Sequence, residues 1–295
     1  MPTPFNWKFP TRNRSNGQRA KWAKSSVIST RSSTTRAFFP NLRRATSRRL
    51  SFRSTTSIAL ITGANKGVGL ETARQLARDH GFTVLIGARD EARGQKAADE
   101  LKAQGLNAQF LLLDPTDAAS IERAAREVQE KFGHLDALIN NAGALVPEDM
   151  ALPAQVPTQA LRDTYDLNVF AVHSVTQAFW ALLEQSDAAR LVNVSSAIGS
   201  LSLVRDFEGP VKDIKFIAYA SSKAALNMLT VHYAWQWRDT RHKANAIHPG
   251  NVKTDANPNG EISVEEGART SVELATIGED GPNGTFSYLG QTLPW

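Results

Sequence analysis

The sequence predicts an α/β fold with a single doubly wound, parallel sheet of about seven strands and helices on both faces. From Ser57 to the end of the chain, short apolar runs rich in β-forming residues alternate with amphipathic helical segments. Strands that alternate with helices of this length imply right-handed β-α-β crossovers, which cover both faces of a parallel sheet. A chain of 295 residues accommodates one such domain but is short for two.

Six apolar runs have the length and composition of buried strands. They are Ile58–Ile61, Phe82–Ile86, Ala108–Leu113, Leu135–Ile139, Leu191–Val194 and Ala244–Ile247. A seventh run, Thr285–Tyr288, is short and is expected to add an edge strand. Between the third and fourth runs, apolar residues of Ile121–Phe132 recur at steps of three and four, which predicts a helix.

Residues 1–56 differ from the rest of the chain in charge. Of the 34 Lys and Arg residues, 13 precede Ile58, and no Asp or Glu precedes Glu71. The 21 basic residues that remain face 29 acidic ones, so the chain from Ile58 onward carries a net charge of −8. Residues 1–56 show no sustained apolar periodicity and cannot bury enough surface to offset their ordering entropy. We therefore expect a basic, Ser/Arg-rich and disordered extension before a domain over residues 57–295.

Three interpretations of this extension stay open. Organellar transit peptides are rich in Arg and Ser and poor in acidic residues. A basic arm can also bind nucleic acid or anionic lipid. The third interpretation is a solvated tail or a mis-assigned start of translation. The expected localisation is cytoplasmic, or mitochondrial or plastid if residues 1–56 are a transit peptide, and no nucleic-acid partner is expected.

The composition argues against several classes of protein. The chain has no cysteine, which rules out disulfides, thiolate nucleophiles and Cys-ligated zinc. Its six histidines never take the i, i+4 spacing of a helical metal site, so we expect no metal site. No run approaches the roughly 18 apolar residues of a membrane-spanning helix, so we expect no membrane span.

A glycine-rich turn joins the first predicted strand to the first helix. It reads Thr62-Gly63-Ala64-Asn65-Lys66-Gly67-Val68-Gly69, and a helix is predicted over Glu71–Arg78. Glycines allow the sharp turn and let the backbone approach a pyrophosphate, while the helix start offers free N–H groups and the positive end of its dipole. This placement indicates a Rossmann-type dinucleotide site. Its candidate residues are Gly63, Asn65, Lys66, Gly67, Val68 and Gly69.

The end of the second strand indicates which dinucleotide is bound. NAD-specific sites commonly place an acidic residue there for the ribose 2′-hydroxyl. Here the strand ends in Arg89, with Asp90 one position later. A guanidinium can hold a 2′-phosphate through two charge-assisted hydrogen bonds, and Lys66 adds a second cation. The pair favours NADPH/NADP as cofactor; the alternative is that both are solvated surface charges.

A tyrosine and a lysine four residues apart indicate acid catalysis. Tyr219 and Lys223 open a later helix, where this spacing puts both side chains on one face. A free phenol has a pKa of about 10. A nearby ammonium and the positive charge of oxidised nicotinamide favour the phenolate. We therefore expect the pKa of Tyr219 to be lowered toward the working range.

With these motifs, residues 57–295 resemble the short-chain dehydrogenase/reductases, most closely the NADPH-dependent carbonyl reductases. The family pattern is carried by the Thr-Gly-x-x-x-Gly-x-Gly turn, Asn140-Asn141-Ala142-Gly143, Asn193-Val194-Ser195-Ser196 and the Tyr-x-x-x-Lys pair. The carbonyl reductase branch is indicated by Asn65-Lys66-Gly67, Ala88-Arg89-Asp90, Arg93-Gly94-Gln95, Glu265-Glu266-Gly267-Ala268, Gly281-Pro282, Gly284, Phe286 and Pro294-Trp295.

The resemblance implies four catalytic residues. Tyr219 would protonate the substrate oxygen as hydride arrives from nicotinamide C4, and Ser196 would hydrogen-bond that oxygen. Lys223 would hold the nicotinamide ribose, and Asn168 would position a water molecule for proton relay. Ser196 is preferred to Ser195 because the family uses the second serine, and adjacent strand residues point to opposite faces.

The resemblance also implies further cofactor contacts, besides those of Tyr219 and Lys223. Asp114 would face the adenine ring, and Asn140 would bond between strands. The wall beside the adenosine half of the cofactor would consist of Asn141, Ala142 and Gly143. The segment after the sixth strand would contact the nicotinamide end through Pro249, Gly250, Val252 and Thr254. His248 before it is expected to pack rather than to catalyse.

The expected activity is NADPH-dependent reduction of an aldehyde, ketone or quinone to the alcohol. The alternative is a sensor or scaffold that binds NADP(H) without turnover. Substrate choice is expected to depend on Ala144–Pro157, the insertion Gly199–Ala218 and the segment after Asp255. Leu145, Val146 and Met150 favour an apolar carbonyl over a sugar. The insertion Gly199–Ala218 is expected to be a substrate-side loop or a variable surface loop without a ligand role. Because it lies near helices that pair in dimeric members, a monomer and a homodimer both stay open.

Overall fold

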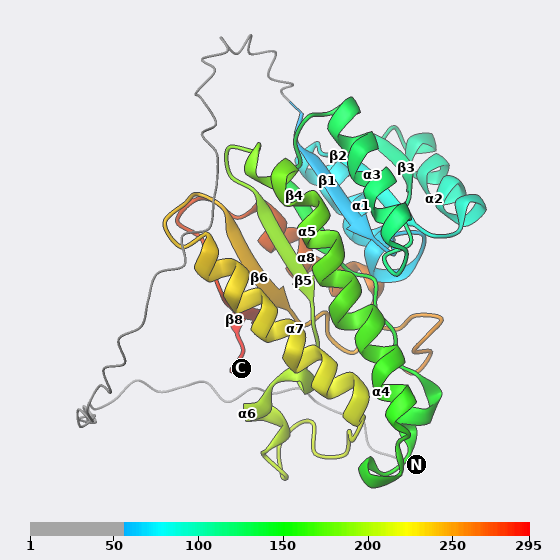
Figure 1. The fold of residues 1–295 in the computed structure, drawn as a ribbon, viewed down its shortest axis with the longest axis vertical. Helices are drawn as coiled ribbons and strands as arrows, with labels where there is room; N and C mark the ends of the chain where they lie inside the picture. Colours follow the sequence, from blue (N-terminus) through cyan, green and yellow to red (C-terminus); the bar gives the residue numbers. More distant parts are fainter. Residues whose placement is uncertain (1–55) are drawn as a thin grey trace, which may run out of the picture. The chain divides into compact units, whose positions relative to one another are not determined.

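A computed structural model describes residues 56–295 of the chain (Figure 1). The predictions for residues 1–56 therefore lie outside the described residues, apart from Thr56. The described part contains one eight-stranded sheet in the order β3-β2-β1-β4-β5-β6-β7-β8. Within residues 56–295, none of the helices combines the length and apolarity that crossing a membrane requires.

The first seven strands are parallel, which confirms the predicted doubly wound sheet. They are β1 Ile58–Thr62, β2 Thr83–Ala88, β3 Ala108–Leu112, β4 Ala137–Asn140, β5 Arg190–Val194, β6 Lys243–Ile247 and β7 Phe286–Tyr288. One further strand was not predicted: β8, Gln291–Thr292, pairs antiparallel with β7. The two-residue turn between them has positive φ at Leu289 and Gly290 (44° and 74°), as a tight hairpin turn requires.

In residues 56–295, six long helices cover the sheet with three on each face, which confirms the predicted helices on both faces. Those on the viewer's side of Figure 1 are α3 Ala118–Lys131, α5 Ala171–Glu184 and α7 Ile217–Gln236. Those behind the sheet are α1 Gly67–His80, α2 Glu91–Ala103 and α8 Val264–Thr276. Two shorter helices are α4 Thr158–Tyr165, which leads into α5, and α6 Leu201–Val204, which lies in the predicted insertion.

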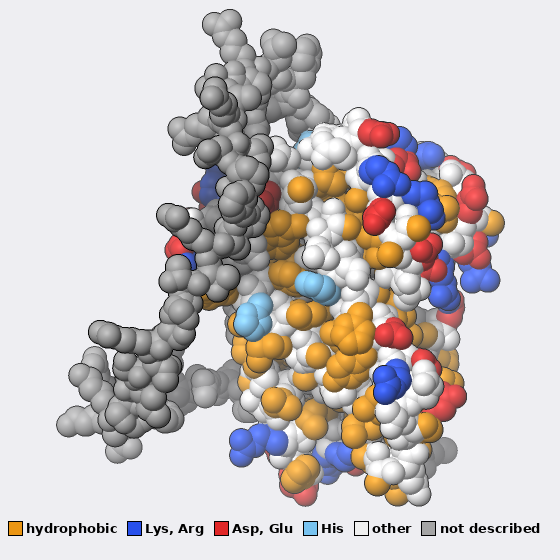
Figure 2. Space-filling view, in the orientation of Figure 1, with side chains coloured by type: hydrophobic (Ala, Val, Ile, Leu, Met, Phe, Trp, Pro, Cys, Tyr) orange, Lys and Arg blue, Asp and Glu red, His pale blue; other side chains and the backbone are white. Residues whose placement is uncertain are grey.

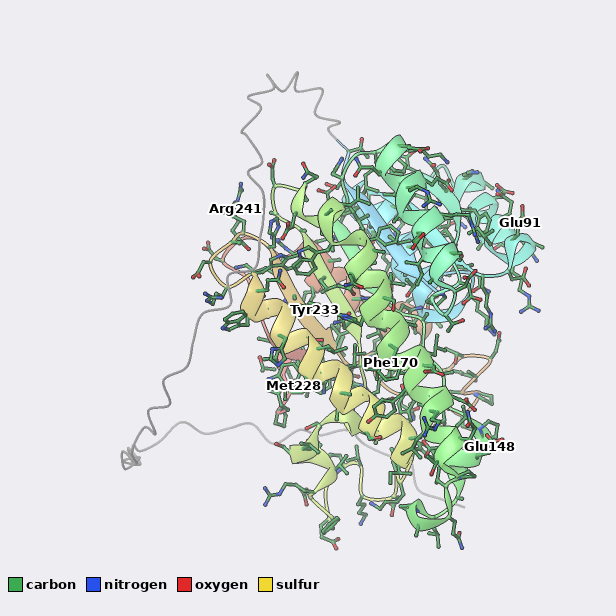
Figure 3. The ribbon with its side chains drawn as sticks, in the orientation of Figure 1. Glu91, Glu148, Phe170, Met228, Tyr233 and Arg241 are labelled. Carbon is green, nitrogen blue, oxygen red and sulfur yellow. The ribbon has the colours of Figure 1, made fainter. Side chains whose placement is uncertain are left out.

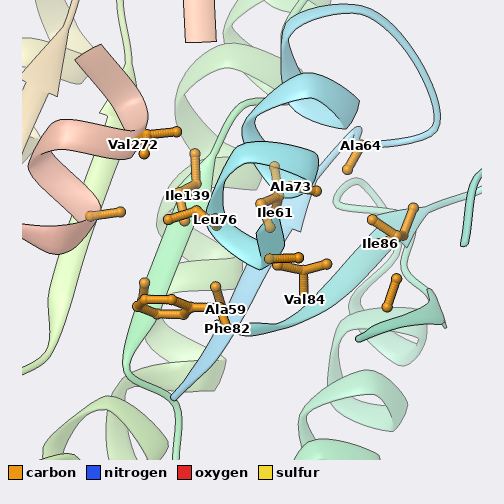
Figure 4. Close-up of a cluster of buried hydrophobic side chains, with 14 of the residues drawn as sticks. Ala59, Ile61, Ala64, Ala73, Leu76, Phe82, Val84, Ile86, Ile139 and Val272 are labelled. Carbon is orange, nitrogen blue, oxygen red and sulfur yellow. The ribbon is translucent and has the colours of Figure 1, made fainter. Parts of the chain in front are cut away.

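Alternate residues of β1 contribute to two separate cores, because successive side chains of a strand point to opposite faces. Ala59 and Ile61 pack with α1, α2 and α8 in the core shown in Figure 4. Ile58 and Leu60 pack with α3, α5 and α7 on the other face. All five residues of β1 are buried, which explains why this central strand is a continuous apolar run.

The chain order of the strands reverses at β1. After β1 the chain forms β2 and β3 on one side, and then returns to form β4 on the other side of β1. In open α/β sheets, such a reversal leaves a crevice at the carboxyl ends of the two strands, where ligands bind. The crevice here lies between the glycine-rich turn after β1 and the segment that follows Asn140 of β4.

Candidate active site

A cleft of about 1060 Å³ opens at this crevice. Its volume is at the upper end of the roughly 300–1,000 Å³ range of small-molecule sites, which suits an extended ligand. Twelve of the predicted cofactor residues line it: Gly63, Asn65, Lys66, Gly67, Val68, Gly69, Arg89, Asp114, Asn141, Ala142, Gly143 and Thr254.

The glycine turn has the backbone geometry that its sequence indicated. Gly63 and Gly67 have φ angles of 65° and 59°, which side chains of L-residues rarely allow. Gly69 is needed for packing, because a Cβ atom there would lie 2.4 Å from Nδ2 of Asn141. α1 begins at Gly67, earlier than the predicted Glu71, since glycines in its first turn hid the start of the helix. Lys66 occupies the N-cap of α1, and its side chain makes no hydrogen bond to the first N–H groups of the helix.

The ends of β1 and β4 are tied together beside this turn. The Oγ1 atom of Thr62 accepts hydrogen bonds from the backbone N–H groups of Asn141 and Ala142, both at 3.0 Å. The side-chain amide of Asn141 donates back to the carbonyl of Thr62 at 2.9 Å. These bonds hold the wall Asn141–Gly143 against the glycine turn.

Positive side chains gather at the open edge of the cleft, after β2. Arg89 is exposed and makes no ion pair within residues 56–295. Asp90 does not face the cleft as an acid for ribose; it caps α2 by accepting from the N–H of Arg93 at 3.0 Å. A smaller cavity of about 300 Å³ adjoins the cleft, lined in part by Lys66, Arg93 and Lys96.

Arg93 and Lys96 were not in the predicted site. Both lie on α2, and both have acidic neighbours on the same helix: Arg93 Nε is 3.4 Å from Asp90 Oδ2, and Lys96 Nζ is 4.0 Å from Glu100 Oε1. The sequence held a signal for Arg93, because it follows Arg89 by four residues at the start of a helix.

A network of buried amides connects β4, β5 and the helices α5 and α7. Asn140 Nδ2 donates to Oδ1 of Asn193 at 2.9 Å and to Oγ1 of Thr176 at 3.0 Å. Asn193 Nδ2 donates to Oγ1 of Thr230 at 2.8 Å. Asn140 therefore bonds between strands, as the family resemblance implied, and stabilises the end of β5 that leads to Ser196.

The structure brings three of the predicted catalytic residues together, at the end of β5 and the start of α7. Lys223 Nζ lies 5.5 Å from the centre of the Tyr219 ring and donates to the carbonyl of Val194 at 2.9 Å. The Ser196 hydroxyl lies close enough to the Tyr219 hydroxyl to lower the pKa of the phenol. Ser196 is partly exposed, whereas Ser195 is buried and bonds the carbonyl of Lys223. This difference supports Ser196 rather than Ser195.

Asn168 lies in a π turn, Asp166–Phe170, that joins α4 to α5 into one long helix. Its side chain bonds both backbone groups of Ala144 at 2.9 Å and the hydroxyl of Ser222 at 3.1 Å. π turns are frequent at functional sites, because they free a backbone group from the regular helical pattern. A role in holding water stays a prediction for Asn168.

Gly143 connects the cleft to the catalytic group. A Cβ atom at this position would lie 3.2 Å from Oδ1 of Asn168 and 3.3 Å from Nζ of Lys223. The absence of a side chain therefore keeps this end of the cleft open next to the lysine.

The pKa of Tyr219 differs from the expectation. Burial raises it to about 12, and the Ser196 hydroxyl, which lowers it, has the smaller effect. Burial also lowers the pKa of Lys223 to about 8. The predicted lowering of the Tyr219 pKa is thus wrong for the protein alone, because loss of hydration outweighs the effect of Ser196. At neutral pH Tyr219 is a protonated phenol.

The segment after β6 only partly follows the prediction. Pro249, Gly250 and Val252 do not line the cleft, whereas Thr254 does. Val252 is buried against Gly267 of α8, and Gly250 has a φ angle of 91°. His248 is buried, packs 5.1 Å from the ring of Tyr288 and has a pKa lowered by burial to about 4, which fits packing.

Comparisons with known proteins agree with this geometry. The family model for short chain dehydrogenase matches residues 57–262. A (+)-neomenthol dehydrogenase of Arabidopsis thaliana is 37% identical, over 79% of this chain and 96% of that protein. Carbonyl reductase [NADPH] 3 of Rattus norvegicus is 35% identical, over 77% and 93%. The structure of NADPH-bound carbonyl reductase from chicken fatty liver superposes with a TM-score of 0.71 and 28% identity, over 81% and 99%.

Proposed function

Because this chain belongs to the short-chain dehydrogenase family of oxidoreductases, we propose that it reduces a carbonyl compound with NADPH. The observation that carries the proposal is the meeting of Tyr219, Ser196 and Lys223, whose lysine lies next to Gly143 of the cleft lining although none of the three lines the cleft itself. An acid, a hydrogen-bond donor and a cation next to a dinucleotide-sized cleft are what carbonyl reduction requires.

The residues of the cleft fit NADPH. The uncapped first turn of α1 offers N–H groups to a pyrophosphate, and Gly69 lets Asn141 pack directly against this turn. Arg89 and Lys66 would hold the 2′-phosphate, with Arg93 and Lys96 adding positive charge nearby. This choice is supported by two similar structures that contain NADPH.

When bound, NADPH supplies a hydride to the carbonyl carbon, and the side chains of this chain handle the proton. The Tyr219 phenol is protonated at neutral pH and would give its proton to the developing alkoxide. The Ser196 hydroxyl would donate a hydrogen bond to the same oxygen. The Val194 carbonyl fixes the Lys223 ammonium, which would hold the nicotinamide ribose. Asn168 would position a water molecule that reprotonates Tyr219.

The carbonyl substrate is proposed to be apolar. In the segment Ala144–Pro157, Leu145, Met150 and Leu152 have 36%, 69% and 67% of their surface exposed. Relatives named (+)-neomenthol dehydrogenase and (−)-isopiperitenone reductase are similar over 77% or more of the chain. Cyclic apolar ketones therefore belong in the first substrate set.

The test is a screen for oxidation of NADPH by the full-length chain with apolar ketones, aldehydes, quinones and sugars. We expect turnover with at least one apolar carbonyl and weaker turnover with NADH. Tight NADP binding without oxidation of NADPH by any carbonyl would instead favour the alternative, a sensor or scaffold.

We also propose that two copies of the chain associate through α5 and α7. Phe170, at the end of the π turn before α5, and Met228 of α7 have 58% and 59% of their surface exposed (Figure 3). Trp235 of α7 has 63% of its surface exposed. Figure 2 shows these helices covered by apolar side chains, with few charges. A large exposed apolar patch commonly marks an interface.

Analytical ultracentrifugation tests the association. We expect the wild-type chain to sediment as a dimer and Trp235→Glu as a monomer, with Glu148→Gln as a control for the loss of a distant surface charge. A monomeric wild-type chain would contradict the proposal.

A further inference from the structure

Asp149 is a fully buried carboxylate in an otherwise exposed stretch of chain. It lies in a short 3-10 helix, Pro147–Met150, between β4 and α4, and has 0% of its surface exposed. Its neighbours Glu148 (labelled in Figure 3) and Met150 are both exposed in the structure. A buried acidic side chain needs hydrogen-bonding partners, because loss of hydration is costly.

Both oxygens of Asp149 bond the start of the helix that bears the catalytic tyrosine. Oδ1 accepts from the backbone N–H of Ala218, and Oδ2 from that of Tyr219, both at 2.8 Å. Asp149 precedes these residues by 69 and 70 positions, so the contact is purely tertiary.

α7 needs this contact because it lacks a local cap. The first N–H groups of a helix have no partner inside the helix, and the N-cap side chain usually bonds those of the second and third residues. Phe216 occupies the N-cap of α7 and makes no side-chain hydrogen bond. Ala218 and Tyr219 are the second and third residues of α7, so Asp149 performs the capping from another segment.

The bond also compensates the charge of Asp149. Within residues 56–295 it makes no ion pair. Two charge-assisted hydrogen bonds and the positive end of the α7 dipole stabilise the buried carboxylate instead. The first turn of α7 is thereby held in one position against the segment after β4.

Two ties then join that segment to α7. At its start, Asn168 links the backbone of Ala144 to the Ser222 hydroxyl of α7. A few residues later, Asp149 links it to Tyr219 itself. Since Ala144 lines the cleft, the cofactor wall and the catalytic tyrosine are held in register.

We propose that Asp149 is a positioning residue for the reaction: it fixes the first turn of α7 so that the Tyr219 hydroxyl stays against Ser196 and the substrate oxygen. Because Oδ2 bonds the amide of Tyr219 directly, any shift of this amide moves the phenol. The inference rests on the proposed function, in which Tyr219 is the acid.

Asp149→Asn tests the inference with little change of shape. The amide nitrogen of asparagine cannot accept, so one of the two N–H groups loses its partner. We expect kcat to fall roughly ten- to hundredfold, as for small misplacements of a reacting group. The Kd for NADP, measured by fluorescence titration, should stay the same. Glu130→Gln, which removes the same charge from the exposed surface of α3, should leave both quantities unchanged.

A double variant separates positioning from mere helix capping. The double variant combines Asp149→Ala with Phe216→Ser. The second substitution places a serine at the N-cap of α7, where it can cap the helix locally. We expect this cap to raise the melting temperature above that of Asp149→Ala while kcat stays low, because the link to the segment after β4 is still missing. Recovery of kcat together with the melting temperature would overturn the positioning role.

The activity of the wild-type chain distinguishes a failure of the Asp149 inference from a failure of the proposed function. If it reduces carbonyls with NADPH and Asp149→Asn is equally active, the inference alone is overturned. If it reduces no carbonyl at all, the proposed function fails and the inference fails with it.

Discussion

Lys66 Nζ lies 3.1 Å from Oδ2 of Asp255, and this ion pair joins the two rims of the proposed cofactor cleft. Lys66 belongs to the glycine turn after β1 and Asp255 to the loop after β6, and both line the cleft and the cavity beside it. The side chains are 60% and 80% exposed, so the pair adds less than about 1 kcal/mol to stability. The pair matters because Asp255 neutralises the positive charge of Lys66 where the 2′-phosphate is proposed to bind.

Asp255→Asn is expected to strengthen binding of NADP. The substitution frees Lys66 for the phosphate and removes a nearby negative charge, which should lower the Kd for NADP up to about fivefold, the range of an exposed ion pair. The Kd for NAD should not change, and Glu261→Gln in the same loop serves as control. Weaker NADP binding would mean that the pair instead holds the cleft closed over the cofactor. Titration of both cofactors distinguishes these outcomes.

Arg89→Asp is expected to raise the KM for NADPH far more than that for NADH. Loss of charged hydrogen bonds to a phosphate costs about 1.5–3 kcal/mol, or roughly 10- to 150-fold. Arg123→Asp, on the surface of α3, removes the same charge away from the cleft and serves as control. Steady-state kinetics with both cofactors provide the measurement, and equal effects on the two would contradict the 2′-phosphate assignment.

Tyr219→Phe is expected to cut kcat by roughly 10²- to 10⁴-fold, the usual contribution of a general acid. The ring and its packing are kept, so NADPH should bind nearly as in the wild type. Stopped-flow oxidation of bound NADPH gives the rate, and fluorescence titration gives the affinity. Undiminished turnover would remove Tyr219 from the role of acid.

The rate of reduction is expected to fall as pH rises through about 8. Burial lowers the pKa of Lys223 to about 8, so its positive charge is complete below that pH and lost above it. The pKa of Tyr219 is about 12, so the acid itself stays protonated across the range. A profile of kcat/KM from acidic to alkaline pH should therefore show one falling limb that belongs to Lys223. A rate that rises through pH 8 would contradict this assignment.

The lowered pKa of Lys223 also predicts in which direction the stability of the protein changes with pH. Between about pH 8 and the unfolded value of 10.5, the unfolded chain binds more protons at Lys223 than the folded chain does. The contribution of Lys223 to the free energy of unfolding therefore rises with pH over that window. Denaturant unfolding of the wild type and of Lys223→Met should differ in their pH dependence there, and parallel curves would contradict the lowered pKa.

Most elements of the fold could be predicted because their signals are local. The strand boundaries differ from prediction by at most two residues, since buried parallel strands are continuous apolar runs. β8 was missed because two residues cannot show a periodicity. The start of α1 was placed too late because glycines are poor helix formers.

Within the site, prediction succeeded where a motif fixes the backbone and failed where burial decides. Gly63, Gly67 and Gly69 lie where the turn needed glycine. Asp149 was missed because an acidic residue between exposed neighbours normally lies in solvent. The direction of the Tyr219 pKa was missed for a similar reason, since desolvation cannot be read from a Tyr-x-x-x-Lys spacing.

The sequence by itself determined the order of strands and helices, the phosphate-binding turn and the pairing of Tyr219 with Lys223 on one helix. All of these depend on residues within a few positions of each other, whose geometry the backbone dictates. Only the tertiary structure decided that Asp149 caps α7, that Lys66 pairs with Asp255, and that burial sets the pKa of Tyr219. These depend on which distant segments pack together and on how much water that packing excludes.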